Sequence, residues 1–136
     1  QVIDDSLILN YFKEHNITNY KKTSSGLYYV VSKDGTGAAP KAGQKVTVNY
    51  TGKLMNGESF DSNTDPKFNH VQPFDFPLGQ HRVIQGWDEG VALMKKGEKA
   101  TFYIPSHLAY GERGAGGGRI APNSVLIFDI ELVSFQ

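Results

Sequence analysis

From residue 26 onward, apolar and polar residues alternate along much of the chain in short stretches that turn residues separate. A period of two places successive side chains on opposite faces of an extended backbone, so each stretch predicts a half-buried β-strand. Asn56 and Gly57 form a strong hairpin signal between two stretches, and Pro105 ends another. The alternating stretches cover residues 46–50, 74–76, 100–104 and 126–133, and a β-branched and aromatic run at 27–31 predicts a further strand.

One segment breaks this period. Ile84, Trp87, Val91 and Met94 are spaced three, four and three residues apart, which places them on one face of a helix. Gly97 follows at the position expected for a C-cap. We therefore predict an α+β domain in which five or six antiparallel strands wrap around one short helix.

Residues 1–22 have a different pattern, because their apolar residues recur at helical spacing. Asp4 and Asp5 stand near the start of this segment and Lys13 near its end, the charge order that the helix dipole favours. The pattern predicts an amphipathic helix of about ten residues, which is too short to persist alone in water and must dock on the domain or on a partner. Its predicted apolar face consists of Ile3, Leu7, Ile8, Tyr11 and Phe12.

We accordingly divide the chain into an N-terminal helical extension, residues 1–22, and one domain, residues 23–136. The total of 136 residues suits a single domain of ordinary size. The chain begins with Gln1 rather than Met, which favours a mature form with any signal or lipid-anchor segment upstream.

The composition excludes several classes of protein. The 14 Lys and Arg residues balance 14 Asp and Glu, so the chain has no net charge with which to attract nucleic acid or an anionic membrane. No apolar run approaches the ~20 residues of a membrane span. The absence of cysteine rules out disulfides, thiolate nucleophiles and cysteine-ligated metals.

Three motifs that could carry enzyme chemistry have simpler interpretations. The four histidines lack the spacing of metal ligands, and we expect no metal site. The glycines in residues 114–118 are not followed by the Lys-Ser/Thr of a phosphate loop, so we interpret them as a surface loop. Asp88 and Glu89 are adjacent on the predicted helix and diverge by about 100°, so we interpret them as a solvated face rather than as paired acids.

Aromatic residues stand at the ends or inner faces of the predicted elements, at seven separate places in the chain. They predict either a large aromatic core or an aromatic pocket, and composition does not decide between the two. Asp61 directly follows Phe60, where strand alternation turns it to the opposite face; if it is buried, its carboxylate needs a partner. The seven residues are Tyr50, Phe60, Phe74, Phe76, Trp87, Tyr110 and Phe128.

Six motifs, taken together and in order, are more specific than any one of them. They are Tyr50-Thr51-Gly52-Lys53-Leu54 with Asn56-Gly57 and Phe60-Asp61-Ser62, then Val83-Ile84-Gln85-Gly86-Trp87-Asp88-Glu89-Gly90, Ile104-Pro105, Ala109-Tyr110-Gly111, Pro122-Asn123-Ser124 and Leu126-Ile127-Phe128-Asp129-Ile130-Glu131-Leu132. This set resembles the signature of the FKBP family of peptidyl-prolyl isomerases, which bind macrolides such as rapamycin. The resemblance covers about residues 24–136.

The resemblance implies a twisted antiparallel sheet curled around one short helix, and a pocket lined by the aromatic set. Trp87 would form the floor of this pocket. Phe60, Asp61 and Tyr110 would be the catalytic residues, with the last two as polar groups at the rim and the Ile84 backbone N–H as a further donor. The remaining substrate-binding residues would be Tyr50, Phe74, Val83, Ile84, Ile120 and Phe128.

The implied function is peptidyl-prolyl cis-trans isomerisation, in which the pocket binds proline and accelerates rotation about X–Pro bonds in unfolded or partly folded polypeptides. A twisted amide is less polar than a planar one, so an apolar pocket favours the twist and no nucleophile, metal or cofactor is required. The expected partners are proline-containing polypeptides and macrolides such as rapamycin, and not nucleic acid.

A second hypothesis is a binding module or chaperone that keeps the pocket with little turnover. The loop Gly116–Arg119 favours it, because the family usually carries a bulky residue and an isoleucine in this stretch. Arg82 is another departure, since many members have an acidic residue there.

The N-terminal segment carries two further expectations. Residues 1–22, together with residues 23–29, resemble envelope members of the family in bacteria, which favours a periplasmic or lipid-anchored bacterial protein. No pocket motif precedes Tyr50, so we expect the helix to be dispensable for turnover.

Overall fold

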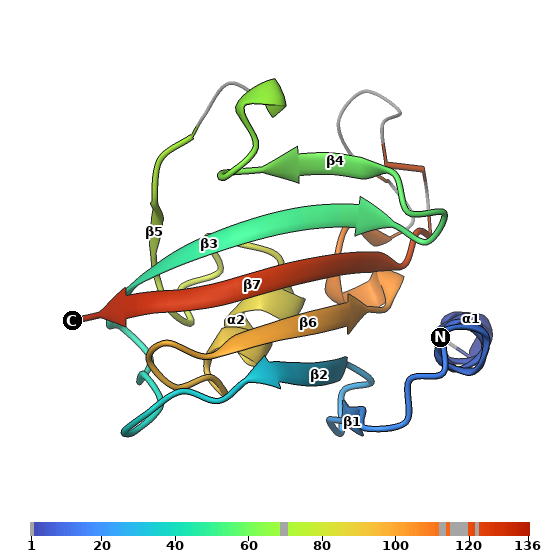
Figure 1. Cartoon of the computed structure of the whole chain (residues 1–136), viewed down its shortest axis with the longest axis horizontal. Coiled ribbons are helices and arrows are strands. Elements are labelled where there is room, and N and C mark those ends of the chain that lie inside the picture. The colour runs from blue at the N-terminus through green and yellow to red at the C-terminus, as the bar shows by residue number, and fades with distance from the viewer. Residues whose placement is uncertain (1, 69–70, 112–113, 115–119, 122) are drawn as a thin grey trace.

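The computed structural model describes residues 2–68, 71–111, 114, 120–121 and 123–136. Within them, seven strands form one antiparallel sheet in the order β1-β2-β6-β7-β3-β4, with β5 paired to β3 (Figure 1). The strands are β1 (Lys21–Lys22), β2 (Tyr28–Lys33), β3 (Lys45–Leu54), β4 (Ser59–Ser62), β5 (Phe74–Pro77), β6 (Lys99–Ile104) and β7 (Leu126–Phe135). The predicted α+β fold is confirmed, with the two-residue β1 as an addition to the expected strands.

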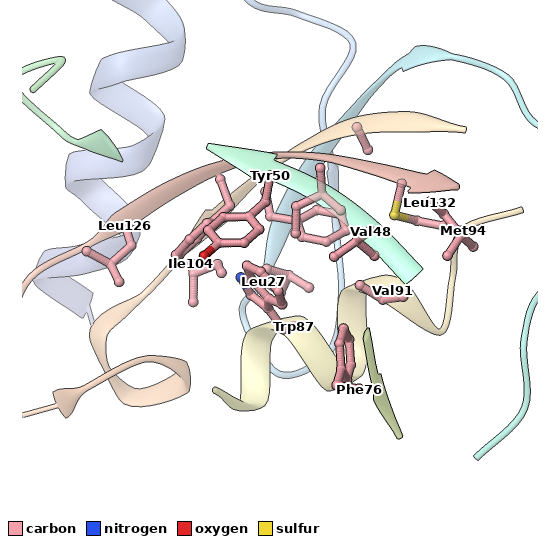
Figure 2. Close-up of a cluster of buried hydrophobic side chains, with 14 of the residues drawn as sticks. Leu27, Val48, Tyr50, Phe76, Trp87, Val91, Met94, Ile104, Leu126 and Leu132 are labelled. Carbon is pink, nitrogen blue, oxygen red and sulfur yellow. The ribbon is translucent and has the colours of Figure 1, made fainter. Parts of the chain in front are cut away.

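The main core lies between the concave face of this sheet and α2 (Gln85–Val91). Alternate residues of the three central strands point into it, among them Val48 of β3, Phe102 of β6 and Ile130 of β7. Trp87 and Val91 point from α2 toward these strands (Figure 2). Each large apolar side chain buried in this way contributes roughly 1.5–3 kcal/mol to stability. The period-two pattern of the sequence therefore defines the inner face of the sheet.

Two glycines let α2 lie directly on β6. A Cβ atom on Gly86 would come within 2.7 Å of Ile104, and one on Gly90 within 2.6 Å of the Phe102 ring. Both distances are shorter than van der Waals contact, so the helix could not approach the strand this closely with larger residues. The position of α2, and of Trp87 on it, depends on these two glycines.

The helix α2 is shorter than the sequence pattern predicts. It ends at Val91, and Gly97, with φ of 85°, lies in a turn before β6 rather than at the helix C-cap. Met94 is nevertheless buried in the core, 1% exposed, because the chain after Val91 continues along the same side of the sheet. The apolar spacing that predicts a longer helix reflects burial alone.

The N-terminal helix α1 (Val2–Glu14) docks on the opposite, convex face of the sheet. Ile8 and Phe12 are fully buried there, and Phe12 meets the ring of Tyr103 edge to face at 4.7 Å. The predicted docking on the domain is confirmed, but the predicted apolar face is partly wrong, because Ile3 is 74% and Leu7 44% exposed. The buried face instead includes Asp4, only 5% exposed.

Short 3₁₀ helices follow two of the strands: η1 (Pro66–Phe68) comes after β4, and η2 (Ser106–Leu108) comes after β6. No helix in the described part of the chain is long and apolar enough to cross a membrane.

Candidate functional site

A cavity of about 220 Å³ opens between the sheet and α2, on the side of β4 and β5. Nine of the ten residues expected at a site lie around it, and Arg82 lines it as well. Ile120, the tenth, is buried in the same hydrophobic cluster, 6% exposed, and does not line the cavity. The lining residues are Tyr50, Phe60, Asp61, Phe74, Arg82, Val83, Ile84, Trp87, Tyr110 and Phe128.

Trp87 lies at the base of this cavity and is 4% exposed. Three rings meet its indole at steep angles: Tyr50 at 5.0 Å, Phe128 at 5.2 Å and Phe74 at 5.9 Å between centroids. Such edge-to-face contacts fix the orientation of each ring. The indole Nε1 is buried and hydrogen-bonds to none of the described residues. Trp87 therefore contributes an aromatic surface to the cavity, while its indole N–H is shielded from solvent.

The polar side of the cavity contains a phenol bonded to a carboxylate. The Tyr50 hydroxyl donates to Oδ2 of Asp61 at 2.8 Å, while Oδ1 of Asp61 accepts the Ser62 N–H at 2.9 Å. Burial, and then the bond to Asp61, raise the pKa of Tyr50 well above its ordinary value of 10. Tyr50 thus stays protonated and keeps the carboxylate fixed.

Tyr110 contributes a second phenol, which is 40% exposed at the rim. Burial of its inner part raises its pKa above 10, and the negative charge of Asp61 adds to this shift. Among the described residues none accepts a hydrogen bond from its hydroxyl. Tyr110 can therefore offer a donor to a molecule in the cavity.

A β-bulge explains how two consecutive residues, Phe60 and Asp61, both reach the cavity. In the ladder between β3 and β4, Gly52 pairs with Asp61 but Lys53 pairs with Ser59, so Phe60 is the extra residue. A bulge interrupts alternation and re-aims a side chain. The sequence-based expectation that Asp61 turns to the opposite face from Phe60 is thus corrected.

Gly52 is a functional position that sequence reasoning missed. A Cβ atom there would lie 2.6 Å from the Phe60 ring and 2.7 Å from the Phe128 ring. Those two rings meet edge to face with 5.5 Å between their centroids, over the bare backbone of β3. A glycine within an otherwise regular strand is the signal that could have identified this close approach.

Asn63 is a second missed residue. Its side chain, 3% exposed, accepts the Tyr50 N–H at 2.7 Å and donates to the carbonyls of Val48 at 2.9 Å and Gln72 at 3.1 Å. The buried amide therefore joins the segment after β4 both to β3 and to the chain leading into β5. This connection joins the segments that carry Asp61 and Phe74, both of which line the cavity.

Asp88 and Glu89 are not the solvated face that their adjacency predicts. Both are only partly exposed, and Asp88 accepts the backbone N–H groups of Gly79 at 2.9 Å and His81 at 3.2 Å. This fixes the loop that leads to Arg82, Val83 and Ile84 at the rim. Glu89 accepts hydrogen bonds from the hydroxyls of Thr23 and Ser25. The two carboxylates thus hydrogen-bond α2 to the loop before it and to the chain before β2. The interpretation as a solvated face was wrong.

Other hollows on the surface have less suitable linings. One of about 310 Å³ contains Asp5, Lys22 and His107, and another of about 340 Å³ lies beside Leu7 and Met55. Neither combines aromatic walls with convergent polar groups, the usual character of a ligand site. No three His, Asp or Glu side chains in the described ranges gather as metal ligands would. The loop Gly116–Arg119 lies outside the described residues.

Comparison with known proteins identifies relatives of this chain. Residues 36–133 match the family model described as FKBP-type peptidyl-prolyl cis-trans isomerase. The chain is 53% identical over 116 residues to the FKBP-type peptidyl-prolyl cis-trans isomerase FkpA of Aeromonas hydrophila, an alignment covering 85% of this chain and 40% of that protein. It is 46% identical over 111 residues to FK506-binding protein 1 of Dictyostelium discoideum, covering 82% of this chain and 99% of that protein.

Among solved structures, the crystal structure of FkpA from Escherichia coli superposes with a TM-score of 0.81 at 39% identity, covering 96% of this chain and 58% of that one. The chain therefore spans less than half the length of the Aeromonas relative and somewhat more than half of the Escherichia structure.

Proposed function

The chain belongs to the FKBP-type peptidyl-prolyl cis-trans isomerase family, and we propose that it accelerates rotation about X–Pro bonds in unfolded or partly folded polypeptides. The observation that carries this proposal is the aromatic cavity over Trp87, with Tyr110 and Asp61 at its polar side. The cavity presents an apolar base with one available phenol donor. That combination suits a proline ring followed by a carbonyl group.

Such a site has to lower the activation barrier by only a modest amount. An uncatalysed X–Pro bond isomerises in ~10–100 s, across a barrier of ~18–20 kcal/mol. An acceleration of about four powers of ten requires roughly 5.5 kcal/mol. Because resonance makes the planar amide more polar than the twisted one, an apolar cavity destabilises the planar form selectively.

Each part of the cavity has a proposed task in this reaction. Trp87 and its edge-to-face neighbours hold the proline ring, and the Phe60 and Phe128 rings exclude water. The Tyr110 hydroxyl and the Ile84 backbone N–H donate to carbonyl oxygens of the bound chain. Asp61, fixed by Tyr50, sets the electric field at the polar side.

The same cavity is our proposed site for macrolides such as rapamycin. A relative in Dictyostelium is named FK506-binding protein 1, and the lining offers a rigid apolar surface of the kind that binds such ligands. Quenching or enhancement of Trp87 fluorescence on adding rapamycin supports this assignment, and a spectrum unchanged at saturation contradicts it.

The isomerase proposal is tested with a proline-containing tetrapeptide and a matched pair of variants. Phe60→Ala opens the cavity to water and is expected to lower kcat/KM by about tenfold or more. Phe68→Ala removes the same ring from η1, which does not line the cavity, and is expected to change kcat/KM less than about twofold. Equal loss in both variants, or no turnover in the folded wild type, contradicts the proposal and favours a binding module.

A further inference from the structure

A buried carboxylate of α1 contacts the segment that carries Tyr110. Oδ2 of Asp4 accepts both the backbone N–H of Ser106 at 2.9 Å and the Ser106 hydroxyl at 2.5 Å. Asp4 is 5% and Ser106 9% exposed, so both bonds are shielded from water. A charge-assisted bond in such surroundings is stronger than a neutral one.

Ser106 is the first residue of η2, and the structure of η2 leads directly to Tyr110. The Ala109 N–H donates to the carbonyl of Ser106 at 3.0 Å, and Leu108, 2% exposed, anchors the turn in the core. Beyond Tyr110, the Gly111 carbonyl accepts the Asn123 N–H at 2.8 Å. The segment that carries the phenol is thus attached through Ser106, Leu108 and Gly111, and Asp4 supplies the charged contact.

Docking of α1 does not by itself require Asp4. The helix already buries Ile8 and Phe12 fully against the outer face of the sheet. Removing a carboxylate from water is costly unless it is well paired, whereas another apolar residue at this position would extend the same cluster. The buried carboxylate of Asp4 is therefore better explained by its hydrogen bonds to Ser106 than by attachment of the helix.

The neighbouring turn provides a parallel connection. His107 Nε2 lies 2.9 Å from the carbonyl oxygen of Ser25, and the Ser25 hydroxyl donates to Glu89 on α2. The chain before β2 therefore contacts η2 and α2, the elements that lead to Tyr110 and carry Trp87. The N-terminal segment is joined to both sides of the site.

We propose that Asp4 is a positioning residue for the reaction: through Ser106 it fixes η2 and so the Tyr110 phenol at the cavity rim. This rests on the proposed isomerase function. It also replaces the expectation that the N-terminal helix is dispensable for turnover, which took no account of a contact between the helix and the site.

The test is a double-mutant cycle in the full chain. Asp4→Ala is expected to lower kcat/KM for a proline tetrapeptide roughly three- to tenfold, yet to lower it less than about twofold in a Tyr110→Phe background, because the group it positions is already absent. Asp5→Ala is the matched control, since Asp5 bonds to Tyr28 and Lys22 and not to η2. It is expected to change kcat/KM less than about twofold in either background.

Amide hydrogen exchange gives a readout that does not depend on turnover. Asp4→Ala should accelerate exchange at residues 106–111, and Asp5→Ala should not. Asp4→Asn, which keeps the shape of the side chain and one acceptor, should recover part of both effects, and it takes the place of Asp4→Ala if that variant does not fold.

Two results overturn the inference: equal kcat/KM for the Asp4 and Asp5 variants in an active wild-type background, or an undiminished Asp4 effect in Tyr110→Phe. An inactive wild type contradicts the proposed function instead. In that case the contact between Asp4 and η2 is still tested by amide exchange, and unchanged exchange at residues 106–111 in Asp4→Ala overturns its positioning role.

Discussion

The two phenols at the cavity have different roles because their hydroxyl groups have different partners. Tyr50 donates to Asp61, so its proton is already used to hold the carboxylate. The Tyr110 hydroxyl donates to no described residue and faces the cavity. The pKa of both phenols is raised, mainly by burial, so both stay protonated throughout the neutral range.

Replacing Tyr110 by phenylalanine measures how much the hydrogen bond from this hydroxyl contributes to kcat/KM. A neutral hydrogen bond contributes about 0.5–1.5 kcal/mol net, so kcat/KM should fall about two- to tenfold. Because the pKa of Tyr110 lies above 10, the donor is present below that value and is lost only as the pH rises through it. The wild-type kcat/KM should therefore be the same at pH 7 and pH 9. A complete loss of turnover in Tyr110→Phe would instead indicate acid catalysis by the phenol.

Arg82 is expected to influence which substrates are preferred. It is exposed on the cavity lining, and no carboxylate of the described residues forms an ion pair with it. An exposed ion pair contributes about 0.2–1 kcal/mol, so peptides with Glu before proline should show up to about fivefold higher kcat/KM than peptides with Lys there.

Charge reversal and salt test this preference. Arg82→Glu should invert the Glu-to-Lys ratio, and raising the ionic strength should bring the ratio toward one in both proteins, because salt screens exposed charges. A Glu-to-Lys ratio that is equal in the wild type and in Arg82→Glu would exclude a role for Arg82.

At the scale of elements, the site depends on a β-bulge in β4 and on a close contact between α2 and β6. The bulge at Phe60 turns consecutive residues of β4 toward the cavity. Gly86 and Gly90 let α2 rest on β6, which places Trp87 beneath the cavity. In both cases the local backbone determines where a side chain of the cavity lies: Phe60 and Asp61 in the first case, and Trp87 in the second.

Gly90→Ala tests the contact between α2 and β6. In an exposed helix this change would stabilise by roughly 1 kcal/mol, because alanine is the better helix former. Here the added Cβ meets the Phe102 ring at 2.6 Å, and overpacking of a core costs about 1–3 kcal/mol. We expect net destabilisation in urea unfolding. Gln85→Ala on the exposed side of the same helix is the control, and a more stable Gly90→Ala protein would show that the contact relaxes freely.

Much of the fold could be predicted because the period of two in residues 46–50, 100–104 and 126–133 follows directly from burial of one sheet face. The ten site residues were identified by resemblance, and all of them except Ile120 lie around one cavity. The bulge at Phe60 could not be predicted, since it depends on the register of β4 against β3 and not on local sequence.

The errors have a common physical cause. Asp4, Asp88 and Glu89 are charged residues that accept hydrogen bonds from groups distant in the sequence or in neighbouring loops. Sequence reasoning assigned Asp88 and Glu89 to a solvated face because adjacent helix positions diverge by about 100°, which argues against paired acids. The pairing partners appear only when the chain is folded.

At the scale of the whole molecule, one sheet carries different structures on its two faces. One face holds the core, α2 and the cavity, and the opposite face holds α1. The connection between them passes the end of β6, through Asp4 and Ser106. A division at residue 22 is therefore a convenient description of the sequence, while the proposed positioning role treats both parts as one functional unit.

The central claim is turnover in the cavity, and exchange NMR on a proline peptide tests it most directly. Without protein the cis and trans forms interconvert in ~10–100 s, too slowly for exchange cross-peaks on the subsecond timescale. We predict that protein at a small fraction of the peptide concentration produces these cross-peaks, and that Phe60→Ala abolishes most of their intensity. The contradicting result is a peptide that shifts Trp87 fluorescence at saturation while its exchange stays as slow as in buffer.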